Sequence, residues 1–120
     1  MANPNIVAVS SIYANTVFDA DVAASAVSLL TCGSDKIQKI NSLVIANIDG
    51  TNAASIDVWI TRSSADYYLA KTISVPADAT LVVLDKNMGL YLMESDILKI
   101  QASAAGDLSA VLSYEEIDDA

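Results

Sequence analysis

Alternation of apolar and polar residues, interrupted by clusters of turn-forming residues, runs through most of this chain. The segment 55–61 is the clearest case, because its isoleucine and valine side chains alternate with Asp57, Trp59 and Thr61. Successive side chains of a β-strand point to opposite faces of the sheet. The period of two therefore predicts a strand with one face in the core and Trp59 on the other face.

The region 37–84 predicts four consecutive strands joined by hairpins. The expected strands are residues 39–48, 55–61, 67–75 and 80–84. The turn at 49–52 reads Asp-Gly-Thr-Asn, residue types that tolerate positive φ and bond their own backbone. Pro76 closes the third strand, because proline cannot donate to a ladder. Strict alternation along that strand places Leu69, Lys71, Ile73 and Val75 on one face with Tyr67.

Further strands are expected on both sides of this region. They are residues 6–14, 22–32, 90–93, 97–103 and 108–117. The segment 22–32 is ambiguous, because its alanines and leucines suit a helix while its valine and serine spacing suits a buried strand. A strand is preferred, since a tight turn at 33–36 follows and everything after it has strand character.

The predicted fold class is all-β. About eight or nine short strands, bounded by turns at intervals of about ten residues, are typical of a two-sheet antiparallel β-sandwich of jelly-roll or immunoglobulin-like type. At 120 residues, the chain has the length of one ordinary domain, so 1–120 is predicted to be a single sandwich. Residues 1–5 are expected to form an N-terminal arm and residues 118–120 an acidic C-terminal tail.

Charge excludes several classes of partner. Fifteen acidic and six basic residues give a formal charge of −9, which repels nucleic-acid phosphates and anionic membrane surfaces. No apolar run approaches the roughly 20 residues that span a bilayer. We therefore expect no nucleic acid and no membrane among the partners.

Catalytic chemistry has little support in the composition. Histidine, the commonest general base and transition-metal ligand, does not occur, and no glycine-rich phosphate cradle is present. Cys32 lacks a histidine to activate it and is expected to be an inert thiol. Asp19 and Asp21 would make a calcium pair, but the loop lacks the further oxygen ligands and the glycine of a calcium motif. We expect no enzyme, no cofactor and no metal site.

Trp59 is the side chain most suited to recognition. It stands between Asp57 and Thr61 on the face opposite the predicted core, where an aromatic residue often anchors a partner. The alternative is a strand buried on both sides, or a tryptophan packed under a loop. Tyr67 and Tyr68 are adjacent on a strand, so one is expected to be buried and the other exposed. A second candidate contact is the N-terminal arm, through Asn3, Pro4 and Asn5.

Three stretches together give the chain a family resemblance. They are KINSLVIANIDGTNAASIDVWITRSS, TISVPADATLVVLDKNMGLYLMESDILKIQAS and DLSAVLSYEEI. The chain resembles, over roughly residues 37–117, the small virion structural proteins of tailed bacteriophages, especially those of marine cyanophages. Each stretch alone is generic hairpin sequence, and the combination is what is specific.

The resemblance implies a β-sandwich that assembles on the virion and has no catalytic residues. It leads us to expect a capsid decoration or cementing protein of the accessory type, assembled in the host cytoplasm and bound to the major capsid protein. A small homo-oligomer, with a trimer favoured, fits clustering around symmetry axes. A tail, neck or fibre component is the alternative in the same setting. A carbohydrate-binding module that stacks sugars on Trp59 and a tyrosine is the alternative from another class.

Overall fold

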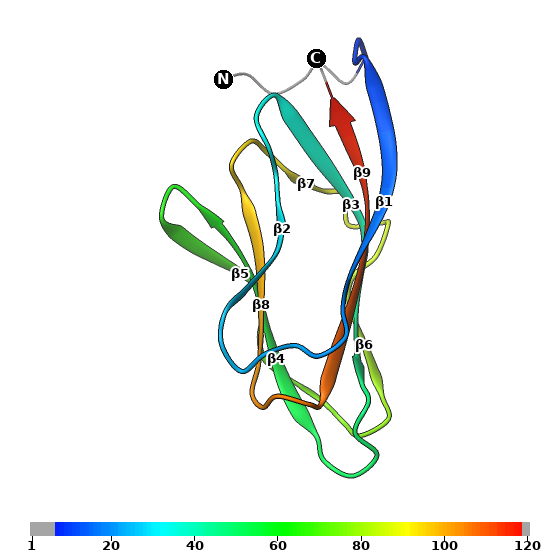
Figure 1. Ribbon diagram of the computed structural model, residues 1–120, viewed down its shortest axis with the longest axis vertical. Helices are drawn as coiled ribbons and strands as arrows, with labels where there is room; N and C mark the ends of the chain where they lie inside the picture. The colour runs from blue at the N-terminus through cyan, green and yellow to red at the C-terminus, as the bar shows by residue number, and fades with distance from the viewer. Residues whose placement is uncertain (1–6, 119–120) are drawn as a thin grey trace.

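The computed structural model describes residues 7–118 as two antiparallel β-sheets packed face to face (Figure 1). These residues contain nine strands and no helix, which confirms the predicted β-sandwich. The strands are β1 Ser11–Asp19, β2 Val27–Thr31, β3 Lys36–Asn47, β4 Ala54–Arg62, β5 Ala65–Val75, β6 Thr80–Leu84, β7 Leu90–Leu92, β8 Ile97–Ala102 and β9 Leu108–Asp118. No helix within residues 7–118 is long and apolar enough to cross a membrane.

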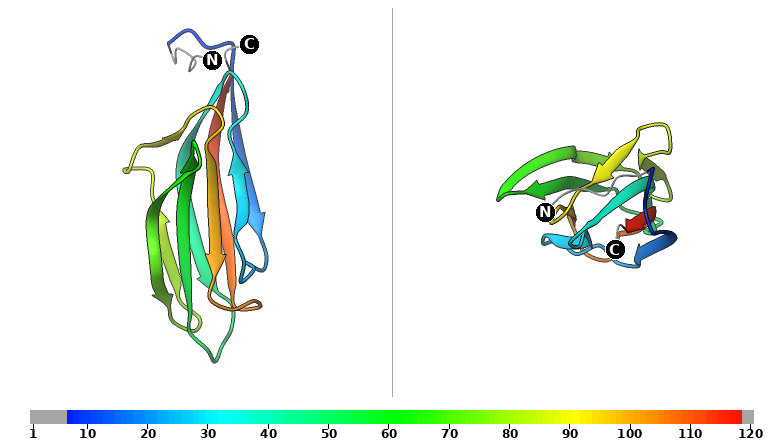
Figure 2. Two further views of the ribbon diagram at one scale, coloured as in Figure 1. Left: turned by 90° about the vertical axis from the view of Figure 1, so that its left-hand side faces the viewer. Right: turned by 90° about the horizontal axis from the view of Figure 1, so that it is seen from above.

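Each sheet mixes strands that lie far apart in the sequence. Sheet A has the order β1-β9-β3-β6, with β7 also paired to β3, and sheet B has the order β2-β8-β4-β5. Every pairing is antiparallel, and the long strands of both sheets run along the same axis of the molecule (Figure 2). Because β1 and β9 come from opposite ends of the chain, non-local pairing sets the register of sheet A.

The core lies between the two sheets. Its largest fully buried aliphatic side chains alternate along the inner faces, as strand geometry requires. They include Ile40, Leu43, Ile45, Leu108 and Leu112 from sheet A, and Ile56, Val58, Leu98 and Ile100 from sheet B. The predicted inward face of residues 55–61 is therefore confirmed.

The first two strands differ from their predicted bounds. β1 begins at Ser11 instead of residue 6, because its pairing with β9 runs from Ser11 opposite Asp118 to Asp19 opposite Ala110. The predicted connection after residue 14 is thus the second half of the strand. β2 covers only the last part of the predicted segment 22–32. Val22 precedes it, fully buried, and its N–H donates to the Leu108 carbonyl at 2.8 Å, so this residue caps the core.

The predicted alternation along β5 is wrong at Lys71, while Tyr67, Ile73 and Val75 share one face as predicted. The register of β4 and β5 shifts twice, on either side of Val58, so that Val58 faces Ala70 and Trp59 faces Tyr68. Thr72 lies in the left-handed region with φ 51°, as a bulge permits. Lys71 consequently reaches Asp57 on the outer face of sheet B, with 3.9 Å between Nζ and Oδ2, instead of sharing a face with Tyr67.

Candidate interaction surfaces

Trp59 lies on the outer face of sheet B, as predicted, but it is not available to a partner. Its neighbours in the sheet are Lys99 on β8 and Tyr68 on β5. The rings of Trp59 and Tyr68 are 5.4 Å apart between centroids, and only 5% of Trp59 is exposed. The register shifts of β5 place Tyr68 against Trp59. Trp59 is therefore buried by a side chain of the next strand, and neither a loop nor a second covered face is responsible.

The expectation that one of Tyr67 and Tyr68 would be buried is wrong. Their exposed fractions are 61% and 45%. Both are exposed because β5 is the edge of sheet B and the β4–β5 hairpin projects away from sheet A, at the left of Figure 1. On this hairpin, Ile60, Arg62 and Tyr67 line an open cavity of about 390 Å³.

The polar neighbours of Trp59 bond within the chain. Asp57 accepts the Thr72 N–H at 2.6 Å. Thr61 Oγ1 donates to Asp66 Oδ1 at 2.7 Å. The ammonium of Lys71 lies 4.5 Å from the centroid of the Tyr68 ring. These contacts hold the bulged part of β5 against β4 and use the polar groups that were predicted to meet a partner. Asn3, Pro4 and Asn5 lie outside the described residues.

An ion pair with a buried carboxylate fixes the turn end of the β4–β5 hairpin. Asp96, 1% exposed, accepts two hydrogen bonds from the guanidinium of Arg62, at 2.7 and 2.5 Å, and one from the Met93 N–H at 2.9 Å. Burial alone would raise the pKa of Asp96, but the Arg62 and Met93 hydrogen bonds and the Arg62 charge together outweigh it. The pKa therefore lies below the usual carboxyl value. The pair joins β4 to the turn before β8.

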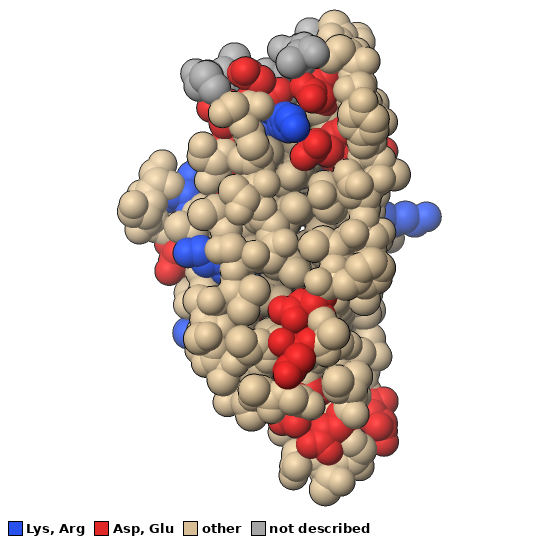
Figure 3. Space-filling model, in the orientation of Figure 1, with Lys and Arg blue, Asp and Glu red and all other residues tan. Residues whose placement is uncertain are grey.

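Acidic turns gather in the lower half and at the upper end of the face in Figure 3. Asp19 ends β1 and Asp21 follows it in the connection to β2, where Asp19 accepts the Asp21 N–H and Asp21 accepts the Gly106 N–H. Nowhere in residues 7–118 do three or more His, Cys, Asp or Glu side chains form a group able to hold a metal ion. The two aspartates order the connections between strands.

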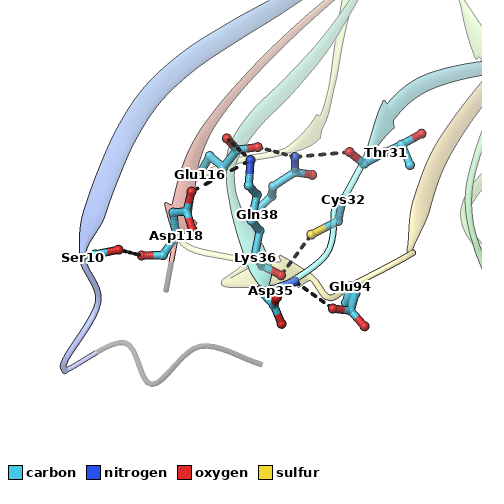
Figure 4. Close-up of polar contacts among 9 residues, drawn as sticks. All are labelled: Ser10, Thr31, Cys32, Asp35, Lys36, Gln38, Glu94, Glu116 and Asp118. Atoms are coloured by element: carbon cyan, nitrogen blue, oxygen red, sulfur yellow. Dashed lines mark hydrogen bonds and ion pairs between the residues drawn. The ribbon is translucent and has the colours of Figure 1, made fainter. Parts of the chain in front are cut away.

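A polar network joins the two sheets at the end of the sandwich where β2 and β9 end and β3 begins (Figure 4). Gln38 of sheet A donates to the Thr31 carbonyl of sheet B at 3.4 Å and to Glu116 at 3.2 Å, and Lys36 pairs with Glu116 at 3.4 Å. Cys32, 1% exposed, donates to the Lys36 carbonyl. Burial, with the nearby carboxylates of Asp96 and Glu116, raises the pKa of this thiol to about 11. The network joins the ends of β2, β3 and β9, and the inertness of the buried thiol stays a prediction.

The outer face of sheet A carries a different kind of surface. Phe18, Val111, Val44 and Val82 lie opposite one another across four strands and point away from the core. Phe18 is 70% exposed and Val82 is 56% exposed. We call these four residues the apolar row.

The positions beside the apolar row carry no charge. On one side lie Thr16, Ser113 and Ser42, and on the other lie Ser109, Ala46 and Thr80. An uncharged, partly apolar patch stands out on a chain with a formal charge of −9. Exposed apolar patches of this kind mark contact surfaces.

Part of this surface was readable from the sequence. Alternation places Val111 opposite to the core residues of its strand. Val44 is different, because only the register shift between Ile40 and Ser42 puts it on the face opposite to Ile40. Phe18 was missed because its segment was read as a connection. The assembly of the row was also missed, because it depends on the order of four strands that do not follow one another in the chain.

Comparison with known proteins identifies structural neighbours only. No protein-family model and no curated protein matches the chain. The chain is similar to a pentameric capsid protein isolated from metagenomic phage sequences, with 17% identity and a TM-score of 0.43 over 87% of this chain. It spans 64% of that protein in one crystal structure and 62% in another.

A second similarity is to a protein of infectious bursal disease virus, strain Gx, with 12% identity and a TM-score of 0.45. It covers 92% of this chain and 33% of the viral one. The neighbours are thus structural proteins of viral particles. At these identities and TM-scores, neither their assembly states nor their functions carry over to this chain.

Proposed function

We propose that the protein is a structural component of a phage virion, of the capsid decoration or cementing type, which acts through protein–protein contacts. The observation that carries this proposal is the apolar row on the outer face of sheet A. The sequence resemblance to small virion proteins over residues 37–117 supports it independently. The proposed partner is the major capsid protein.

The energetics of the apolar row suit a repeated, weak contact. Complete burial of one large aliphatic or aromatic side chain contributes about 1.5–3 kcal/mol. Association costs at least about 4 kcal/mol in lost freedom, so four partly exposed side chains leave only a modest net affinity for one copy. Many copies on a symmetric particle multiply such an affinity through multivalency. The surface therefore fits a protein that binds an ordered array.

The position on the particle has two candidates. The decoration proposal places the protein on the shell, as a homo-oligomer for which clustering around three-fold axes would favour a trimer. A tail, neck or fibre component would use the same surface elsewhere. Immunogold labelling of virions separates the two, because it shows whether the label covers the shell or one vertex.

The carbohydrate-binding alternative is weakened by the structure. A sugar-stacking platform needs an exposed aromatic face, and Trp59 is nearly buried against Tyr68. Tyr67 and Tyr68 alone would have to form the platform. A glycan array tests this directly, and reproducible binding to any glycan would revive the alternative.

Binding to purified capsids tests the proposed function. The variant Val82→Lys places a charge in the apolar row at an exposed position of an edge strand. Leu69→Lys is the matched control, because Leu69 is exposed on β5 of the other sheet. We expect Val82→Lys to lose at least about tenfold in capsid affinity, since it would bury an unpaired charge in the contact, while Leu69→Lys binds normally. Equal binding by both variants would overturn the role of the apolar row.

A further inference from the structure

We propose that β1 pairs with β1 of a second copy, antiparallel and around a two-fold axis at Asn15, so that sheet A continues through two molecules. The inference gives the proposed homo-oligomer a two-fold contact along β1, in place of the trimer, and rests on the proposed function only for its role in a virion. The dimer itself is a property of the isolated protein.

Besides the three-residue β7, four strands form the edges of the two sheets within residues 7–118, and β1 differs from the other three. Edge strands normally carry devices that prevent further pairing, such as bulges, short length or charged residues. The register shifts at β2, β5 and β6, and β2 and β6 are short. β1 keeps an unbroken register with β9 from Ser11 to Asp19. It lies at the right of Figure 1, on the far side from the β4–β5 hairpin.

The residues of β1 are suited to pairing with their own copy. Between Ser11 and Phe18 the strand has no charged residue, and positions 12–16 are exposed. The sequence Ile-Tyr-Ala-Asn-Thr-Val-Phe has large residues at both ends and small or polar residues in the middle. This pattern is symmetric around Asn15, which is also the central residue of the strand.

A two-fold axis at Asn15 therefore pairs every residue of the strand with a compatible one. Ile12 comes opposite Phe18 of the second copy, and Tyr13 comes opposite its Val17. Aromatic residues opposite β-branched ones are favourable cross-strand pairs. Asn15 meets its own copy, and an amide has both the donors and the acceptor for a reciprocal hydrogen bond. Asp19 meets Ser11, so like charges do not oppose each other.

The same axis joins the apolar surfaces of the two molecules. Ile12 lies on the same face of β1 as Phe18, because an even number of positions separates them, and it is 55% exposed. With Phe18 opposite Ile12 of the second copy, the apolar row of one molecule continues into an isoleucine of the other. The dimer would thus present two apolar rows on one face of a sheet twice as wide, which is a larger contact than one copy offers a partner.

Charge substitutions at the axis test the dimer. In Asn15→Lys the two ammonium groups face each other, and in Asn15→Asp the two carboxylates do. Sedimentation equilibrium should show wild-type protein at twice the chain mass of 12.6 kDa in the micromolar range. Each variant should dimerise at least about tenfold more weakly, because like charges oppose each other. An equimolar mixture of the two variants should recover dimers, because an ammonium of one chain then faces a carboxylate of the other. Ser74→Lys, on the exposed edge strand β5, is the control and should behave as wild type.

Cross-linking gives a readout that does not depend on charge. Directly opposite residues of an antiparallel pair have Cβ atoms about 4.5–5.5 Å apart, close to disulfide geometry. Asn15→Cys should therefore form a covalent dimer on mild oxidation, while Ser74→Cys should not, and buried Cys32 does not compete. Any of three results would overturn the dimer. Wild-type protein could stay monomeric, the equimolar mixture of Asn15→Lys and Asn15→Asp could dimerise no more strongly than either variant alone, or Asn15→Cys and Ser74→Cys could cross-link equally. If dimers form but capsid binding is absent, the proposed function fails and the dimer stands.

Discussion

Removal of Arg62 should destabilise the protein in a manner that depends on pH. In Arg62→Met the methionine keeps much of the apolar stem, but the Asp96 carboxylate loses both guanidinium hydrogen bonds and keeps the one from the Met93 N–H. Loss of one partner of a fully buried ion pair costs about 3–5 kcal/mol. Half of the Arg62 side chain is exposed, so water will solvate part of the stranded carboxylate. We therefore expect a loss of about 2–3 kcal/mol at pH 7, or about 8–12 °C in Tm for a domain of this size.

The sign of the pH dependence follows from the lowered pKa of Asp96. A carboxyl group whose pKa is lower in the folded than in the unfolded state stabilises the fold above the unfolded value of about 3.9. That stability disappears as the pH falls through the folded pKa. In Arg62→Met we expect burial without the guanidinium to raise the pKa of Asp96 instead. The difference between the two proteins should thus be largest at neutral pH and shrink below about pH 4.

Urea denaturation at pH 7 and at about pH 3.5 measures the difference in free energy of unfolding between wild type and Arg62→Met. Circular dichroism monitors the unfolding, at one protein concentration throughout. Asp96→Asn and the double variant complete a double-mutant cycle, in which the double variant should lose less than the sum of the single losses. An equal loss for Arg62→Met at both pH values would refute the assignment of the effect to the Asp96 charge.

Three further predictions concern the interior and the turns. Native Cys32 should resist thiol reagents at pH 8, because a buried thiol with a pKa of about 11 forms little thiolate, and fast labelling without denaturant would contradict this. Asn47→Ala should cost about 2–3 kcal/mol in urea denaturation, since buried Asn47 donates to the Asn52 and Val75 carbonyls and accepts the Asp49 N–H; a loss below about 0.5 kcal/mol, within the ordinary range of surface substitutions, would contradict it. Leu43→Ala, at a fully buried core position, should cost about 2–5 kcal/mol without a change of fold, and an unchanged midpoint would argue against the packed core.

Local alternation was sufficient to predict the fold class. Ile56, Val58 and Ile60 lie on the predicted inner face, because β4 is flanked on both sides in its sheet and packs on sheet A. Sequence reasoning failed where non-local contacts decide the structure. The bounds of β1 follow from its register with β9, and no local sequence pattern predicts that register.

The candidate surface could be predicted only in part, for the same reason. The bulges of β5 have no clear signature in the sequence, yet they bring Tyr68 onto Trp59 and bury the residue that seemed most available. The apolar row takes residues from four strands, so it becomes visible only when their order is known. Alternation could assign Val111 to an outer face, but it could not show that Phe18, Val44 and Val82 complete the surface.

Cryo-electron microscopy of virions that contain the protein tests the central claim most directly. The account predicts copies on the shell, joined in pairs along β1, with the outer face of sheet A seated on a neighbouring protein and the β4–β5 hairpin farther from the contact. Particles in which the apolar row of Phe18, Val44, Val82 and Val111 faces solvent, while another surface makes the contact, would contradict it.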